Sequence, residues 1–413
     1  MKTLIFLVVY CFIFLIFEIY AFQALKTVVK NKTFLLVYKI ISAFLYFIIL
    51  FYLTKFDRKL GMTRENMYTM GALLLIMVPK MVVTFFMFSE DIVRILTAVI
   101  NYFINSDSKG LFLPNRRKFI SQISLGIAAI PFLSMIYGIT VGRYNYKVIK
   151  QRLFFPDLPD EFDGFTITQI SDVHSGSFDN PEKINYAIDL VNEQNSDLIL
   201  FTGDIVNNKA QEMHPWIDVF NRIDKHNYGK FAVLGNHDYG EYIDFPNAQS
   251  KLDNFNAIKN LYGQIGFDLL LNQHKFIKKG NDKIAIVGVE NWGKSFKQAG
   301  DLNLAATNLS KNDFKILMSH DPSHWEYEVK NHDKHFQLTL SGHTHGMQFG
   351  IEIPGIIKWS LAQFAYKQWA GLYENLGRFI YVNRGFGFHA FPGRVGIMPE
   401  ITVIELKKGN NIA

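Results

Sequence analysis

Residues 336–346 read FQLTLSGHTHG, in which a run of strand length leads directly into two histidines between glycines. The same order recurs at SDVH (171–174), GD (203–204), GNHD (235–238) and SHD (319–321), each after a run rich in β-branched or aromatic residues. These runs predict strands at 165–170, 198–202, 231–234, 314–318 and 336–340. Because active sites of open α/β sheets lie at the carboxyl ends of strands, we expect the polar residues to converge on one edge of an α/β domain.

The residue types in these loops indicate a metal site. Asp, Asn and His together suit divalent Mn, Fe or Zn, whereas a cysteine-rich set would indicate structural zinc. The single cysteine, Cys11, lies far from all of them in the sequence. Taken alone, Gly203-Asp204 and Gly235-Asn236 are ordinary turn sequences. All five motifs in one order, each after a strand, predict a shared metal centre.

Together the motifs resemble those of the calcineurin-like metallophosphoesterases, over about residues 160–407. The resemblance is strongest to a bacterial, membrane-anchored branch, in which the last motif continues into Gln348 and a later YVNRGFG segment, here 381–387, precedes Pro399-Glu400-Ile401. This branch commonly has a glycine where the chain has Met347, a change that would reshape the loop without removing a ligand. The resemblance implies a two-sheet β-sandwich flanked by helices.

The resemblance also implies two divalent metal ions and their ligands. The first ion would be held by Asp172, His174, Asp204 and His345, and the second by Asp204, Asn236, His320 and His343, so that Asp204 bridges them. Two such ions lower the pKa of a bound water and neutralise phosphoryl charge during in-line displacement. His237 corresponds to the family's general acid, a role that suits imidazole. Asp238 would orient or charge His237, or alternatively cap a helix.

Other residues carry weaker signals. Arg384, His389 and Arg394 lie in or beside a loop expected to border the site, and they are candidate substrate contacts or plain loop residues. The aromatic stretch 359–373 suits either core packing or a hydrophobic lip near lipid. The remaining histidines are expected at the surface: His214, His226, His274, His324, His332 and His335.

The N-terminal third has a different composition. Apolar runs at 4–22, 34–53, 70–88 and 120–141 are each long enough for a membrane-spanning helix. We therefore predict a membrane domain at 1–145, a polar linker at 146–159 and a phosphoesterase domain at 160–413. The segment 91–104 suits an interfacial helix or an extension of the third span. Lys80 lies inside that span, where a cation is paired or functional unless it reaches toward the membrane surface.

Basic residues flank the spans almost evenly, so their distribution does not orient the chain. The segment 115–120, NRRKFI, precedes an apolar run and resembles a twin-arginine export signal. If these arginines stay in the cytoplasm, the phosphoesterase domain lies outside. Ordinary juxtamembrane arginines would have the same sequence, and in that case the side of the membrane stays open. The sequence thus predicts a multi-pass cell-membrane protein and favours an extracytoplasmic catalytic domain only weakly.

The formal charge of +6 is modest, and no basic cluster with interleaved aromatic residues indicates nucleic acid as a partner. We predict a membrane-anchored phosphoesterase that hydrolyses phosphate mono- or diesters or pyrophosphates with metal-activated water. The anchor is compatible with a lipid-linked or cell-envelope substrate and also with a soluble one. The alternative is a membrane sensor or scaffold that uses the phosphoesterase domain as a binding module with weak catalysis.

Overall fold

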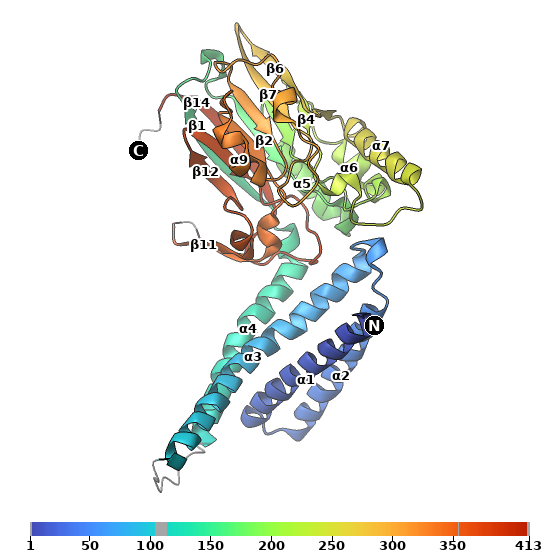
Figure 1. The fold of residues 1–413 in the computed structure, drawn as a ribbon, viewed down its shortest axis with the longest axis vertical. Helices are drawn as coiled ribbons and strands as arrows, with labels where there is room; N and C mark the ends of the chain where they lie inside the picture. The colour runs from blue at the N-terminus through green and yellow to red at the C-terminus, as the bar shows by residue number, and fades with distance from the viewer. Residues whose placement is uncertain (1, 104–113, 354, 411–413) are drawn as a thin grey trace. The chain divides into compact units, whose positions relative to one another are not determined.

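The computed structural model of the chain describes residues 2–103, 114–353 and 355–410 (Figure 1). The chain divides into two compact units. The first comprises Met1–Phe56 with Tyr68–Tyr137, and the second comprises Asp57–Met67 with Gly138–Ala413. All strands of the described residues belong to the second unit.

Long helices make up the first unit: α1 (Lys2–Val28), α2 (Lys32–Thr54), most of α3 (Arg64–Phe103) and α4 (Pro114–Thr140). Each of the four is long and apolar enough to cross a membrane. Large apolar side chains remain exposed on them, such as Phe12 at 65% and Phe85 at 67%, which suits an apolar surrounding. The predicted spans are confirmed as helices, and residues 91–103 extend the third one.

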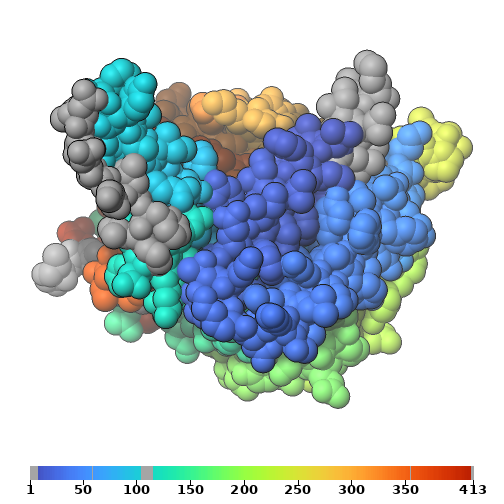
Figure 2. Space-filling view, turned by 90° about the horizontal axis from the view of Figure 1, so that it is seen from below, coloured from blue at the N-terminus to red at the C-terminus, as the bar shows by residue number. Residues whose placement is uncertain are grey.

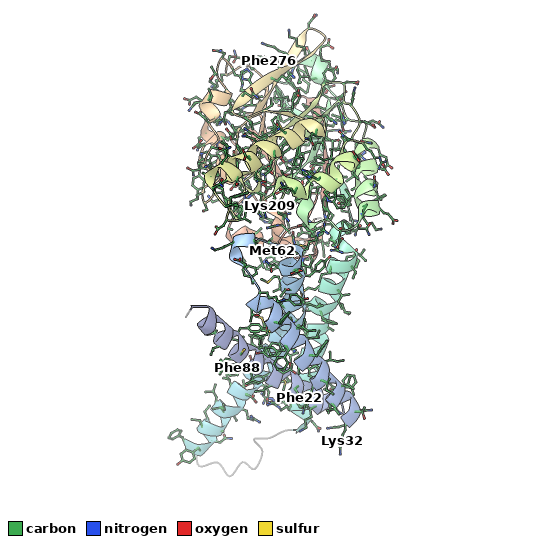
Figure 3. All side chains as sticks on the ribbon, turned by 90° about the vertical axis from the view of Figure 1, so that its right-hand side faces the viewer. Phe22, Lys32, Met62, Phe88, Lys209 and Phe276 are labelled. Atoms are coloured by element: carbon green, nitrogen blue, oxygen red, sulfur yellow. The ribbon has the colours of Figure 1, made fainter. Side chains whose placement is uncertain are left out.

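Neighbouring helices of this unit pack through aromatic and polar side chains. The helices α1 and α2 lie side by side (Figure 2), with Tyr10 stacked on Tyr46 at a centroid distance of 5.9 Å. Phe22 of α1 and Lys32 of α2 lie toward the end of the bundle where the chain passes from one helix to the next (Figure 3). The first unit is therefore a packed helical bundle.

Lys80 is paired inside this bundle. Its ammonium group forms an ion pair with Glu18 of α1 and donates a hydrogen bond to Ser42 Oγ of α2 at 2.8 Å. Ser42 Oγ donates in turn to Glu18 Oε2 at 2.6 Å. The Lys80 and Glu18 side chains are only 11% and 20% exposed, so Lys80 does not reach toward the membrane surface. The pairing offsets part of the cost of placing two charges among apolar helices.

Two six-stranded sheets form the centre of the second unit. The first has the order β1 (Lys147–Phe155), β14 (Glu400–Lys408), β2 (Thr166–Ile170), β3 (Leu198–Phe201), β4 (Lys230–Ala232) and β5 (Asp268–Leu269). The second has the order β12 (Gly371–Asn375), β13 (Arg378–Val382), β9 (Leu338–Ser341), β8 (Lys315–Met318), β7 (Asp282–Gly288) and β6 (Gln273–Lys279). A separate hairpin pairs β10 (Gly350–Ile353) with β11 (Ile357–Ser360).

The sheets pack face to face with helices outside them. Leu200 of the first sheet and Ile316 of the second belong to the same buried cluster between them. Other clusters cover the outer faces, where Ile188 packs with Phe201 of the first sheet and Trp325 packs with the second. The helices are α5 (Pro181–Asn192), α6 (Ile217–Phe220), α7 (Ala248–Gln264), α8 (Leu302–Ala305) and α9 (Ser323–Tyr327). The predicted two-sheet sandwich flanked by helices is confirmed.

Strand direction explains why distant motifs meet. β2, β3 and β4 run parallel in the first sheet, and β8 and β9 run parallel in the second. Each of these strands ends just before one of the polar loops identified in the sequence. Since parallel strands present their carboxyl ends at one edge, each sheet brings its loops together.

The segment predicted as a linker, 146–159, contains strand β1 instead. β1 pairs in parallel with β14 from Lys147 opposite Glu400 to Phe155 opposite Lys408. Leu153 and Phe155 are buried, whereas Lys147 and Lys150 are exposed. Such a basic strand suits the edge of a sheet, where charged side chains discourage further strand pairing. Local composition therefore could not distinguish it from a linker.

The short segment Asp57–Met67 is part of the second unit. Met67 is buried in the cluster that contains Phe178, and Arg64 Nε donates to the carbonyl of Gly176 at 3.3 Å. Arg64 Nη2 also donates to the carbonyl of Phe178. A fragment that begins after α4 would lack these contacts, so the second unit is complete only in the full chain.

Candidate metal centre

The ligand loops hold strained backbone conformations. Asp172, Asp204 and His343 have positive φ angles of 52°, 62° and 71°, which non-glycine residues rarely adopt. Such strain gathers at functional sites, where the surrounding structure enforces it. At Gly342 a Cβ would lie 1.9 Å from Ser171 Oγ. Only glycine at this position therefore lets the loop after β9 approach the loop after β2. The tight turns bring side chains from separate strands within contact distance.

One group of candidate ligands combines Asp172, His174 and His345. Their ligand atoms all lie within 4.8 Å of one another, and all three residues are buried. His345 Nε2 is 3.3 Å from Asp172 Oδ1, and His174 Nε2 is 3.6 Å from Asp204 Oδ2. The structure therefore brings together every residue expected around the first ion.

A second group combines Asp204, His320 and His343, whose ligand atoms again lie within 4.8 Å of one another. His320 Nε2 is 3.1 Å from Asp204 Oδ2. Asn236 Oδ1 lies 3.2 Å from His320 Nε2 and 2.7 Å from His343 Nδ1. Asp204 thus faces the histidines of both groups, as a bridging ligand must.

Charges in the site are strongly coupled. Burial lowers the pKa of His174 well below its usual value, and the nearby His389 and His237 rings lower it further. Burial would also lower the pKa of His320, but the Asp204 carboxylate outweighs it and raises that pKa to about 10. The pKa of Asp204 is held well below its usual value, because His320 overcomes the effect of burial. Without metal, a proton on His320 therefore balances Asp204, and a divalent cation would displace it.

The donor set fits divalent metal ions. Carboxylate, amide and imidazole groups converge, and His345 Nε2 makes no well-formed hydrogen bond among the described residues, although Asp172 Oδ1 lies 3.3 Å away. A buried polar atom that is so weakly satisfied is costly unless something binds it. Mn, Fe or Zn matches this mixture of nitrogen and oxygen donors better than Mg or Ca, which prefer oxygen.

His237 stands beside the ligands with a fixed orientation. Its Nδ1 is 2.7 Å from the carbonyl oxygen of Asn207, so Nδ1 carries the proton and donates to that carbonyl. Its backbone N–H donates to Asp204 Oδ1 at 2.8 Å. The ring packs edge to face on His174 at 4.8 Å between centroids. This geometry leaves Nε2 as the nitrogen that can exchange a proton with a substrate.

Asp238 does not orient the His237 ring, contrary to one of the roles predicted for it. Its carboxylate accepts hydrogen bonds from the backbone N–H groups of Asp204, Ile205 and Gly235 at 2.9–3.0 Å. The Tyr262 hydroxyl donates a fourth at 2.9 Å. Burial and the nearby Asp204 raise the pKa of Asp238 to about 7. Asp238 therefore joins the loop of Asp204 to the loop of Gly235. It does not cap a helix, because it lies inside the short 3-10 turn His237–Tyr239.

Asn207 organises the histidines and was missed from the sequence. Its Oδ1 lies 3.0 Å from His174 Nδ1 and 3.1 Å from His389 Nδ1, and its carbonyl holds His237. Its backbone N–H donates to Glu212 Oε2 at 2.5 Å. The only sequence signal is its place three residues after Asp204. A side-chain acceptor behind a metal-ligating histidine fixes its tautomer and orientation.

We expect Asn207→Ala to weaken metal binding about 10- to 100-fold, because His174 would lose the acceptor that fixes its ring. The measurement is a Mn titration of the metal-stripped full chain. Asn208→Ala is the matched control, since the Nδ1 atoms of the three histidines bond to Asn207 and not to Asn208. Equal affinities of the two variants would contradict the positioning role.

The three candidate substrate contacts have different surroundings. His389 lies against the site, stacked on His174 at 4.8 Å between centroids. Arg384 forms ion pairs with Glu352 and Glu400, and the residue is only 6% exposed. Arg394 is fully buried; it donates to the carbonyls of Arg384, Gly385 and Gly387 and, through Nη2, to His345 Nδ1 at 3.0 Å. The two arginines therefore have no free face for a substrate in this structure, because their guanidinium groups already hold protein acceptors.

Two further residues near His343 belong to segments noted in the sequence but were not predicted to act at the site. The Tyr366 hydroxyl lies 2.7 Å from His343 Nε2, and Asp321 Oδ2 lies 3.5 Å from the same nitrogen. Asp321 Oδ2 is buried without a hydrogen-bond partner among the described residues. In the aromatic stretch 359–373, Trp369 is buried and Phe364 is 78% exposed. The stretch therefore contributes to the core and also to the surface.

The surface prediction for the remaining histidines is wrong for His324. That residue is fully buried, stacks on Trp292 and has its Nδ1 2.8 Å from Ser319 Oγ. His214 is exposed, and the others are half-buried: His226, His274, His332 and His335. None of these belongs to the candidate ligand groups of the described residues.

Comparison with known proteins assigns the family. "Probable Calcineurin-like phosphoesterase, transmembrane domain" matches residues 1–143, and "Calcineurin-like phosphoesterase" matches residues 165–347. The metallophosphoesterase YkuE of Bacillus subtilis (strain 168) is 33% identical over 307 residues, which cover 72% of this chain and 99% of YkuE. The chain therefore belongs to the calcineurin-like metallophosphoesterases, and it is a membrane-anchored member.

More distant relatives share this assignment. The "Transmembrane protein with metallophosphoesterase domain" of Danio rerio is 24% identical, with 66% of this chain and 60% of the relative covered. "Phosphodiesterase YaeI" of Escherichia coli (strain K12) is 28% identical, with 71% and 99% covered. The crystal structure of a 5'-nucleotidase precursor from Thermus thermophilus matches with a TM-score of 0.33 and 12% identity, over 59% of this chain and 54% of that one. That structural likeness is too distant to bear on function.

Proposed function

We propose that the protein is a hydrolase that cleaves phosphate mono- or diesters or pyrophosphates at a centre for two divalent metal ions. The position of Asp204 carries the proposal, because its Oδ2 atom lies 3.6 Å from His174 Nε2 of one ligand group and 3.1 Å from His320 Nε2 of the other. Asp172, His174 and His345 would complete the first ion's ligands. Asn236, His320 and His343 would complete those of the second.

The chain's own groups have distinct roles in this reaction. Divalent ions bound here would supply an activated water and offset the charge of the phosphoryl oxygens. His237 protonates the leaving oxygen through Nε2, while the Asn207 carbonyl holds Nδ1–H and stabilises the charged ring. Asp238 is a positioning residue that fixes the Asp204 and Gly235 loops. We further propose His389 as a substrate contact, and Arg384 and Arg394 as supports of the loop that carries it.

Metal dependence tests the proposed activity. The full chain, stripped of metal in detergent and resupplied with Mn, Fe or Zn, should regain turnover of aryl phosphate mono- or diesters or of a lipid pyrophosphate. The expected result is activity that depends on added metal and is lost again with chelator. Metal binding without turnover of any of these substrates would contradict the hydrolase and favour the sensor or scaffold.

We propose that the catalytic unit lies outside the cytoplasm. Four helices that each cross the membrane would put the residues before α1 and those after α4 on one side, and the connections after α1 and α3 on the other side. The segment NRRKFI lies in the first turns of α4, next to the second of these connections, and its resemblance to an export signal supports a cytoplasmic location there. Arg117 also forms ion pairs with Glu90 and Asp91. These ion pairs give Arg117 a structural role that is independent of export.

Cysteine labelling decides the side. In a Cys11→Ser background, the exposed Asn375→Cys should react with a membrane-impermeant maleimide in intact cells, and Asn31→Cys after α1 should react only after lysis. Both positions are exposed, so the two variants are matched in accessibility. The reverse pattern would place the catalytic unit in the cytoplasm.

A further inference from the structure

The helical unit contains a cavity of about 480 Å³ that the phosphoesterase chemistry does not use. Residues of all four helices line it, including Ala21, Tyr38, Ser42, Pro79, Lys80 and Ala128. Its volume lies within the range of small-molecule sites. Nearly all of its surface is hydrocarbon, so an occupant must be largely apolar.

Polar atoms are confined to one part of this cavity. Tyr38, Ser42 and Lys80 are the polar residues among those that line it. Glu18 lies midway along the span Val8–Val28, and Ser42 lies near the middle of Lys32–Thr54. The polar part of the cavity is therefore at a depth where a bilayer offers no water to hydrogen-bonding groups.

The ion pair limits the charge of the occupant. Lys80 binds Glu18 and Ser42, and its ammonium group lies 4.7 Å from the centre of the Phe14 ring. The cluster already balances its positive and negative charges. A further charge at this depth would have no counter-ion and would be expensive, so an uncharged polar group fits best.

A proline beside Lys80 supplies a hydrogen-bond acceptor. Pro79 has no N–H and cannot donate the usual helical hydrogen bond to the carbonyl of Leu75. Both residues line the cavity. In hydrocarbon, where no water is available, a hydrogen bond from any donor that reaches this carbonyl is stabilising. A hydroxyl group both donates, as this carbonyl requires, and accepts, as Lys80 allows, because its ammonium group has three N–H donors and bonds to Glu18 and Ser42.

We propose that this cavity binds one long-chain lipid alcohol, with its chain against the apolar wall and its hydroxyl beside Tyr38, Ser42 and Lys80. The site is separate from the metal centre, and binding does not depend on the proposed hydrolysis. An alcohol of this kind is what remains when a lipid phosphoester loses its phosphate. The helical unit would thus hold a lipid alcohol as well as anchor the chain.

Photolabelling of the full chain in nanodiscs tests the proposal. The probe is hexadecanol with a diazirine in its chain, and hexadecanoic acid with the same diazirine is the matched anionic probe. Ala128→Trp fills the cavity, whereas Ile130→Trp adds the same bulk at a residue of α4 that is 65% exposed and does not line it. We expect saturable labelling of cavity residues by the alcohol, reduced about tenfold in Ala128→Trp and unchanged in Ile130→Trp.

Ser42→Ala keeps the test valid if the tryptophan variant does not fold. It removes one hydroxyl with little loss of volume, so labelling by the alcohol should fall while labelling by a diazirine alkane of the same length should not. Equal labelling of the two tryptophan variants would overturn the proposal. So would labelling by the acid that equals or exceeds labelling by the alcohol, because it would indicate general lipid contact or an anionic ligand.

Discussion

Asp204→Asn should lose both metal ions and lower kcat/KM by about 10³-fold or more. The substitution keeps the size of the side chain but removes the negative charge that faces His174 and His320. In the proposed two-ion centre, neither ion would then keep its shared ligand, and several kcal/mol of stabilisation of the phosphoryl charge would be lost. Turnover of an aryl phosphate and elemental analysis of the purified chain measure the two effects.

Asp218→Asn is the control for this change, because Asp218 is exposed and belongs to none of the candidate ligand groups of the described residues. It should keep both metals and full activity. An Asp204→Asn protein that retains two metal ions would refute the bridging role. Retained turnover with one ion would instead show that a mononuclear site suffices.

His237→Gln should slow the hydrolysis of esters with poor leaving groups by about 10²- to 10⁴-fold, the range that general acids contribute. Activated aryl esters, whose leaving oxygens need little protonation, should be affected far less. The reason is that Nδ1 is fixed on the Asn207 carbonyl and Nε2 is left to deliver the proton. A series of aryl and alkyl phosphates with different leaving groups provides the measurement.

His214→Gln is a matched control at an exposed histidine. It should leave the dependence on the leaving group unchanged. If His237→Gln slowed all esters equally, the ring would have another role, such as binding the phosphoryl group. The general-acid assignment would then be wrong.

Patterns within short segments predicted much of this structure. The strand predicted at 336–340 is observed at Leu338–Ser341, so its end lies one residue beyond the predicted one. Helix α5 likewise begins at local signals, with Pro181 in its first turn and Asn180 as its cap, whose side chain accepts from Lys183 N at 3.0 Å. Helix starts and strand runs depend on neighbouring residues, so a sequence displays them directly. The convergence of the ligand residues followed because strands carry them to their carboxyl ends.

Features that depend on distant partners were not predictable. Nothing near Asn207 in the sequence indicates that it will contact His389, and nothing near Arg394 shows that its guanidinium group will be enclosed by carbonyls. Likewise, the strand character of 147–155 depends on its partner β14, more than 240 residues later. The partner of Lys80 is Glu18, on another helix. Such pairings follow from tertiary packing and override local composition.

The central claim is that Asp204 joins two metal ions in one centre. Electron paramagnetic resonance of the Mn-loaded full chain tests it most directly, because two Mn ions about 3.5–4 Å apart and bridged by one carboxylate are spin-coupled. We predict the multiline signal of a coupled pair at two Mn per chain, and no protein-bound Mn signal in Asp204→Asn, which should bind neither ion. A signal of isolated Mn in the unaltered chain, saturating at one ion per chain, would contradict the account.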